Sequence, residues 1–211
     1  MNLSRRDLLK MLGAIALVPT IMPSFAFQNS GTPGYFTFVN KARQNGWLRL
    51  NISQLMEKIA LEFIDKPYVG GTLDISDTTE TCIVNLDKFD CVTYFETVLG
   101  MARAFKFSKF DYEDLLAQMQ FTRYRDGKID GYTSRLHYTA DWIYDNIKKR
   151  VVRDVTKDLG GEKIQFNTYF MSDNPDKYRA LAANPELIPI IKKQEEEINK
   201  RDYYYLPKEK V

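Results

Sequence analysis

The chain has 211 residues, with 30 basic and 28 acidic side chains, two cysteines and a single histidine. Its formal net charge of +2 is too small to indicate a protein that binds nucleic acid through an excess of basic residues. One histidine is too few for the usual catalytic zinc site, which takes about three protein ligands, mostly histidines. We therefore expect no metal and no cofactor, and a hydrolytic function would need a thiol nucleophile.

Residues 1–26 have the pattern of a twin-arginine-like export signal. Arg5 and Arg6 precede an apolar stretch over residues 8–18, and the small-x-small triplet at 24–26 (SFA) follows it. The apolar stretch is too short to span a bilayer comfortably. We predict an exported, periplasmic protein whose remaining residues, 27–211, form one domain with balanced charge and no membrane contact. General secretion is the alternative route.

Helical periodicity begins after a polar linker at residues 28–33. Five segments are predicted to be helices, from the spacing of their residues and the capping or helix-breaking residues at their ends: residues 53–63, 91–105, 112–120, 140–149 and 188–201. Asp90 is the natural N-cap of the second segment, which places Cys91 in its first helical turn. The last segment is highly charged, and we expect it to be a solvated helix.

Strand patterns appear only in the second half of the chain. Residues 121–125 alternate in polarity, Asp126-Gly127 is typical of a hairpin turn, and residues 135–138 form a candidate strand that holds His137. Residues 151–156 and 164–171 are further strand candidates. Helices followed by a mostly antiparallel sheet indicate an α+β domain.

The candidate chemistry centres on Cys91 and His137. A helix N-terminus favours the thiolate and offers unpaired backbone N–H groups to an oxyanion, so Cys91 is well placed to be a nucleophile. His137 is the single imidazole that could act as its base. Cys82 is expected to be dispensable and not to pair with Cys91, since a disulfide would consume the nucleophile.

Several segments resemble a known family. Residues 67–71 (PYVGG) and 89–93 (FDCVT) are similar to NlpC-type papain-like cell-wall hydrolases. More narrowly, the chain resembles the N-acetylmuramoyl-L-alanine amidase-like branch of that superfamily at residues 85–96, 130–138 (DGYTSRLHY), 141–146 (DWIYDN), 154–156, 160–161 and 170–172. The resemblance implies a papain-like core with N-terminal helices, the catalytic cysteine at a helix N-terminus, and an antiparallel sheet that carries the histidine. It also implies cleavage of the amide between N-acetylmuramic acid and L-alanine in soluble muropeptides, including anhydro forms.

The group that orients His137 is left open between two carboxylates. Asp154 is the first choice, because residues 151–156 are expected to pair beside the histidine strand, and Asp141 is the competitor, about one helical turn after His137. Candidate substrate-binding or oxyanion groups complete the site. These are Tyr68, whose hydroxyl would donate, Asp90 at the helix start, Ser134, and Arg135, which would pair either with a substrate carboxylate or in an ordinary surface salt bridge.

Two other functions remain possible at this stage. A peptidase that cuts between L-alanine and D-glutamate would use the same thiol, and the bond depends on a pocket shape that sequence does not give. A non-catalytic wall-binding domain would keep the cysteine and histidine without using them. In each case the expected partners are peptidoglycan fragments, and we expect a monomer.

Overall fold

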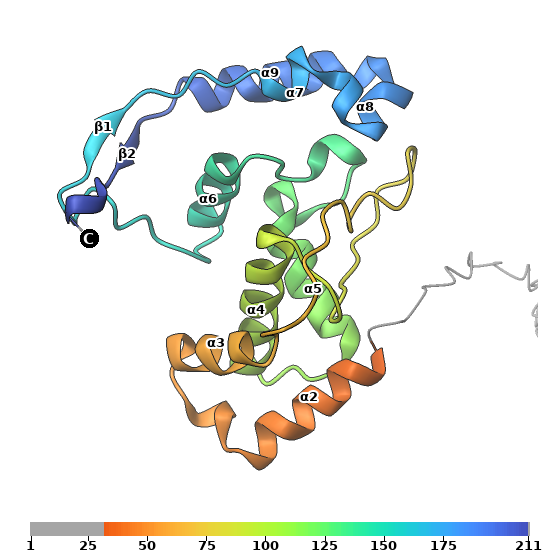
Figure 1. The fold of residues 1–211 in the computed structure, drawn as a ribbon, viewed down its shortest axis with the longest axis vertical. Helices are drawn as coiled ribbons and strands as arrows, with labels where there is room; N and C mark the ends of the chain where they lie inside the picture. The colour runs from red at the N-terminus through yellow and green to blue at the C-terminus, as the bar shows by residue number, and fades with distance from the viewer. Residues whose placement is uncertain (1–31, 211) are drawn as a thin grey trace, which may run out of the picture.

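The computed structural model describes residues 32–210, and the export signal predicted at residues 1–26 lies outside them. Within that range the chain is mostly helical, with a small two-stranded antiparallel sheet (Figure 1). The helices are α2 (Thr32–Gln44), α3 (Ile52–Leu61), α4 (Cys91–Lys106), α5 (Tyr112–Arg123), α6 (Thr139–Lys148), α7 (Phe170–Asp173), α8 (Arg179–Ala183) and α9 (Ile188–Asn199). The strands are β1 (Glu162–Ile164) and β2 (Tyr203–Tyr205), and short 3-10 turns, among them Tyr132–Ser134, link the helices.

The main core surrounds α4, which runs through the middle of the molecule (Figure 1), and α3 lies along it, with Ala60 O accepting from the Tyr94 hydroxyl in the first turn of α4. Apolar side chains of α2, α3, α4 and α5 fill this core, including Tyr35, Ile59, Met101 and Leu115, each fully buried. Gly100 lets α5 approach closely, because a Cβ at this position would lie 2.5 Å from Met119 Sδ. Burial of this apolar surface holds the antiparallel pair α4 and α5 together.

The predicted helices in these segments are confirmed, with small shifts at their ends. Cys91 is the first residue of α4, and residues 53–63, 112–120 and 140–149 correspond to α3, α5 and α6. The polar linker at residues 28–33 overlaps the start of α2, a helix that the sequence analysis missed. Its Tyr35, Val39 and Ala42 are buried at a spacing of three to four residues, typical of a helix with one apolar face.

The predicted antiparallel sheet carrying His137 is wrong for the residues that the structure describes. Residues 121–123 are the last turn of α5, and Tyr124 makes one isolated antiparallel bridge to Arg135. The chain does reverse at the Asp126-Gly127 turn, where both residues have positive φ. Residues 151–156 contain no strand, and of residues 164–171 only Ile164 belongs to one.

The C-terminal helices form a layer over the rest of the molecule (Figure 1). They enclose a second core of Met171, Leu181 and Ile191. Next to them β1 pairs with β2 in an antiparallel register that places Lys163 opposite Tyr204. The charged helix predicted at 188–201 is confirmed as α9, but it is not a wholly solvated helix, because Ile191, Glu195 and Ile198 are buried on one face.

Within residues 32–210, none of the helices is long and apolar enough to cross a membrane.

Candidate active site

The first turn of α4 presents the Cys91 thiol to solvent. Asp90 forms a capping box with Thr93: its Oδ1 accepts from the Thr93 amide at 2.8 Å, and its own amide donates to Thr93 Oγ1 at 2.9 Å. An aspartate N-cap of this kind stabilises a helix by about 1 kcal/mol. Asp90 therefore fixes the backbone on which Cys91, an exposed free thiol, begins the helix.

Two backbone amides beside the thiol are available to a ligand. The helix gives no partner to its first N–H groups, and among the described residues the amides of Cys91 and Val92 donate no hydrogen bond. The positive end of the helix dipole adds to their attraction for negative charge. This arrangement suits both a thiolate and an oxyanion that forms next to it.

A short backbone bridge places Tyr68 beside this helix start. Tyr68 and Phe89 form an isolated parallel bridge, in which the Val69 amide donates to Phe89 O at 2.8 Å and the Phe89 amide donates to Pro67 O at 3.1 Å. Phe89 turns inward against Phe63, while Tyr68 is 75 % exposed. The sequence-predicted neighbours Tyr68, Asp90 and Cys91 are thus brought together.

His137 lies in the segment between α5 and α6, on the side of α4 that faces α6. The preceding residue, Leu136, packs with Leu99 of α4 and Trp142 of α6, and its amide donates to Arg123 O at 3.0 Å. Trp142 in turn stacks edge-on against Phe95, one turn along α4 from Cys91. The histidine segment is therefore anchored to the N-terminal half of α4. In the described part of the chain, the Cys91 thiol and His137 are not hydrogen-bonded to one another.

A backbone carbonyl fixes the tautomer of His137. Nε2 lies 2.9 Å from Tyr132 O, and because a carbonyl only accepts, Nε2 carries the hydrogen. Nδ1 of the neutral ring is then the basic nitrogen, and it makes no hydrogen bond to any described residue. The imidazole also packs on the ring of Tyr132, with centroids 4.3 Å apart. Sequence reasoning missed this acceptor, since a backbone oxygen leaves no side-chain signature.

The two carboxylates considered for that role lie elsewhere. Asp154 is exposed and its Oδ1 accepts from the Thr156 amide at 2.9 Å, within a segment that is not a strand. Asp141 is buried, and its two oxygens accept from Arg125 at 2.6 Å and Arg201 at 2.7 Å. Neither carboxylate is hydrogen-bonded to His137.

Arg135 and Ser134 are engaged within the chain. The Arg135 guanidinium, which is buried, binds Asp74 at 2.5 Å and lies 3.4 Å from Glu80. It therefore forms a buried ion pair, which differs from the ordinary surface salt bridge that the sequence analysis gave as one of its two options. The Ser134 hydroxyl is buried in a turn, where it donates to Gly131 O at 2.7 Å and accepts from the Asp130 amide.

The environment of His137 keeps its ring neutral. Burial, followed by the positive charge of Arg135, lowers the pKa of His137 from 6.5 to about 3. The ring is therefore neutral at neutral pH, but a pKa this far below the working pH makes it a weak base in the absence of substrate. Burial has a different effect on the second thiol: it raises the pKa of Cys82 to about 11, so that Cys82 stays protonated.

A buried ion pair between Glu96 and Arg123 joins the elements that carry the site residues. Glu96 accepts from Arg123 at 2.8 Å and from the Trp142 indole at 3.0 Å, and Arg123 also donates to Ile83 O at 2.7 Å. These contacts tie together α4, α5, α6 and the loop before Cys91. Among the described residues, no group of three or more histidine, cysteine, aspartate or glutamate side chains is arranged to hold a metal ion.

Solved structures provide the comparisons. An N-acetylmuramoyl-L-alanine amidase from Bacteroides uniformis is 37 % identical, with a TM-score of 0.69 over 74 % of this chain and 65 % of its own. A Bacteroides fragilis protein provisionally called a xylanase is 39 % identical, with a TM-score of 0.67 over 72 % of this chain and 66 % of its own. A Legionella pneumophila protein shares the fold at 19 % identity, with a TM-score of 0.57 over 82 % of this chain and 60 % of its own.

The chain thus spans somewhat less than two thirds of the length of the solved structures it matches. No curated protein matches it. Residues 58–211, which include the whole of the segment from Tyr68 to His137, match a family model described as AmiA-like, N-acetylmuramoyl-L-alanine amidase-like. The chain belongs to this AmiA-like, N-acetylmuramoyl-L-alanine amidase-like family.

Proposed function

We propose that this protein is an exported, periplasmic cysteine amidase that hydrolyses the amide between N-acetylmuramic acid and L-alanine in soluble muropeptides. The observation that carries the proposal is Cys91 itself, an exposed thiol on the first residue of α4 beside two unpaired amides, within the part of the chain that the amidase-like family model matches. The Bacteroides uniformis amidase supports the choice of bond.

The reaction begins with proton transfer from the Cys91 thiol to Nδ1 of neutral His137. The thiolate then attacks the amide carbonyl carbon, and the carbonyl oxygen becomes an oxyanion, which accepts hydrogen bonds from the Cys91 and Val92 amides. The exposed Tyr68 hydroxyl is a third donor from the neighbouring bridge. Since the apo geometry has no Cys91–His137 hydrogen bond, substrate binding has to bring the two groups together.

Breakdown of the tetrahedral intermediate returns the proton. The imidazolium of His137 gives it to the leaving L-alanine nitrogen, the C–N bond breaks, and a thioester to Cys91 remains. A water molecule, deprotonated by His137, hydrolyses the thioester and regenerates the thiol.

Mass spectrometry of soluble disaccharide-peptides after incubation tests the proposal. Free stem peptides beginning at L-alanine are expected from the native protein, none from Cys91→Ala, and undiminished amounts from the matched control Cys82→Ala. His137→Gln should also be inactive, whereas a zinc chelator should change nothing. Products beginning at D-glutamate would identify the endopeptidase alternative, and activity in Cys91→Ala would refute a thiol mechanism altogether.

We further propose that soluble fragments are preferred to intact sacculi. The net charge of the part of the chain after the predicted signal is close to zero, which gives it little attraction for a polymeric anionic wall. At equal peptide concentration, disaccharide-peptides should be cleaved much faster than sacculi. Equal rates would contradict this preference.

A further inference from the structure

Two neighbouring side chains of α9 reach the ends of the histidine segment, residues 133–138. Gln194 Nε2 donates to Thr133 O at 2.9 Å, and Glu195 Oε1 accepts from the Tyr138 hydroxyl at 2.5 Å. His137 lies between these two attachment points and directly precedes Tyr138. One turn of α9 therefore spans the segment that carries the imidazole.

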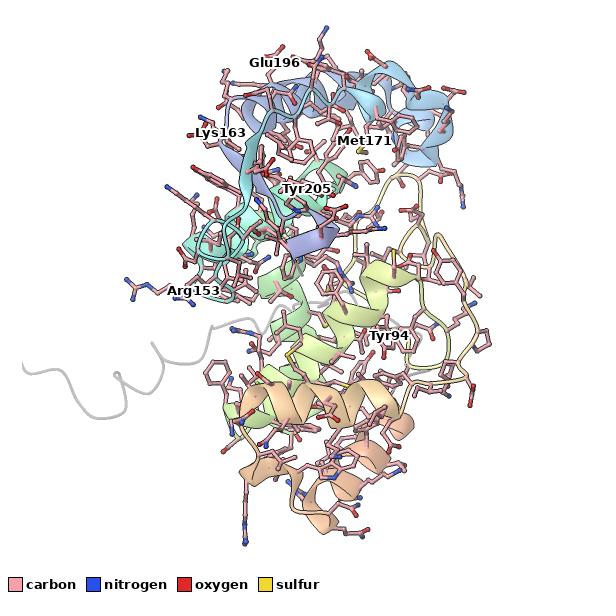
Figure 2. The ribbon with its side chains drawn as sticks, turned by 60° about the vertical axis from the view of Figure 1, so that its left-hand side comes forward. Tyr94, Arg153, Lys163, Met171, Glu196 and Tyr205 are labelled. Atoms are coloured by element: carbon pink, nitrogen blue, oxygen red, sulfur yellow. The ribbon has the colours of Figure 1, made fainter. Side chains whose placement is uncertain are left out.

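Glu195 is buried in an unusual way. Its side chain is fully enclosed, yet the described residues place no cation beside it and give its Oε2 no hydrogen-bond donor. Besides Tyr138, Oε1 accepts from the amides of Met171 at 3.0 Å and Ser172 at 3.3 Å, at the start of α7. Figure 2 shows Met171 on the inner side of the C-terminal layer and Glu196, the next residue after Glu195, on its outer side. Burial of a carboxylate without a paired cation is costly, so the three hydrogen bonds that Oε1 accepts call for an explanation.

The tyrosines on either side of His137 provide that explanation. Tyr132 and Tyr138 both pack against the second core, formed by Met171, Leu181 and Ile191. Tyr132 O is the acceptor that fixes the tautomer of His137, and Tyr138 is the residue that Glu195 binds. Burial and the bond to Glu195 raise the pKa of Tyr138 to about 12, so its hydroxyl remains a donor to Glu195 at neutral pH. The position of α9 therefore affects both tyrosines that flank His137 in the sequence segment.

We propose that Glu195 is a positioning residue, which acts through Tyr138 to hold the His137 imidazole against Tyr132 O with Nδ1 free. Its effect on turnover rests on the proposed function, in which His137 is the base. Its effect on the ring itself does not depend on that function. Displacement of a base by about 1 Å costs on the order of a hundredfold in rate, so a small loss of restraint is measurable.

Tyr138→Phe is the principal test, because it removes the hydroxyl and keeps the ring in the second core. Tyr203→Phe is the matched control: its hydroxyl donates at 3.0 Å to Ile198 O on the same helix but has no contact with the histidine segment. Tyr138→Phe should lower kcat on a soluble muropeptide by about tenfold or more with KM within about twofold, whereas Tyr203→Phe should change neither. Glu195→Gln, which keeps an oxygen acceptor, should retain more activity than Glu195→Ala.

The second readout is the imidazole, and the chain has only one histidine. With 15N-labelled histidine, the native full chain should show a protonated Nε2 and an unprotonated Nδ1 near pH 7, and Tyr138→Phe should shift both signals toward the averaged values of a ring exchanging between tautomers. Unchanged nitrogen shifts in Tyr138→Phe would overturn the positioning role. Equal loss of kcat in Tyr138→Phe and Tyr203→Phe would overturn it as well, because the effect would then belong to α9 in general. If His137→Gln were fully active, the base assignment would fall, while the nitrogen shifts would still decide the role of Glu195.

Discussion

His137 should make the free energy of unfolding fall as the pH falls, and His137→Gln should remove this part of the pH dependence. Its pKa is about 3 in the folded protein and 6.5 when the imidazole is free of the fold, so the unfolded chain binds a proton first as the pH falls. The contribution is therefore present above pH 6.5 and is lost as the pH falls toward 3. Each pH unit between the two values costs about 1.4 kcal/mol of unfolding free energy, which gives about 2 kcal/mol between pH 6.5 and 4.5 after allowance for partial ionisation at the upper end.

Urea denaturation at pH 6.5, 5.5 and 4.5 measures this effect when the native chain is compared with His137→Gln. Other groups that titrate in this range are the same in both proteins, so their contributions cancel in the difference. Glutamine does not titrate and can still donate a hydrogen bond to Tyr132 O, so it is a suitable reference. If the two proteins lost the same stability from pH 6.5 to 4.5, the imidazole would not be held neutral by the fold, and our account of its environment would be refuted.

Two more predictions concern the thiols and the buried ion pair. Under native conditions a thiol reagent should modify one cysteine rapidly, Cys91, and should reach buried Cys82 only after denaturation, because the pKa of Cys82 is raised to about 11; two fast thiols or none would contradict this. Glu96→Ala should lower the free energy of unfolding by about 3 to 5 kcal/mol in urea titrations, because it leaves Arg123 buried without its partner. In contrast, replacement of Lys163 by Ala should leave the free energy of unfolding almost unchanged, because its ion pair with Asp202 is exposed to solvent.

The helices could be predicted because their signals are local. Asp90 and Asn51 cap α4 and α3 through their own side chains, and the apolar residues that follow repeat at helical spacing. The position of Cys91 followed directly from the first of these caps. Hydrophobic periodicity and capping residues lie within a few positions of one another, so they can be read without knowledge of the fold.

The strand predictions failed, because alternation of polar and apolar residues over a few positions, as in residues 121–125, also occurs at the end of a helix. Thr122, Arg123 and Tyr124 are all buried, the first two at the end of α5 and the third in a bridge to Arg135. Arg123 is buried only because Glu96, 27 positions earlier, lies against it. Such a partner is a property of the assembled fold, as is the Tyr132 carbonyl that binds His137.

The buried face of α9 was missed for the same reason. Its sequence is dense in charge, and the isolated segment reads as a solvated helix. The core that covers Ile191 comes from α7 and α8, which are too short to give a periodic signal of their own. Glu195 reads as one more surface charge until Tyr138 and the start of α7 are placed beside it.

The bond from His137 to a main-chain oxygen has a consequence for how this protein tolerates variation. An orienting aspartate can be lost in one nucleotide change and loses its charge in acid, whereas a peptide carbonyl is present whatever residue occupies position 132 and does not titrate. In saturation mutagenesis we would then expect every substitution to abolish turnover without affecting folding at Cys91 and His137 alone, and at no third, histidine-orienting position. Orientation of His137 would depend instead on residues that set the backbone conformation near Tyr132. Gly131 has a φ of +68°, so a substitution there would reduce activity by changing the backbone conformation and not by removing a reacting group.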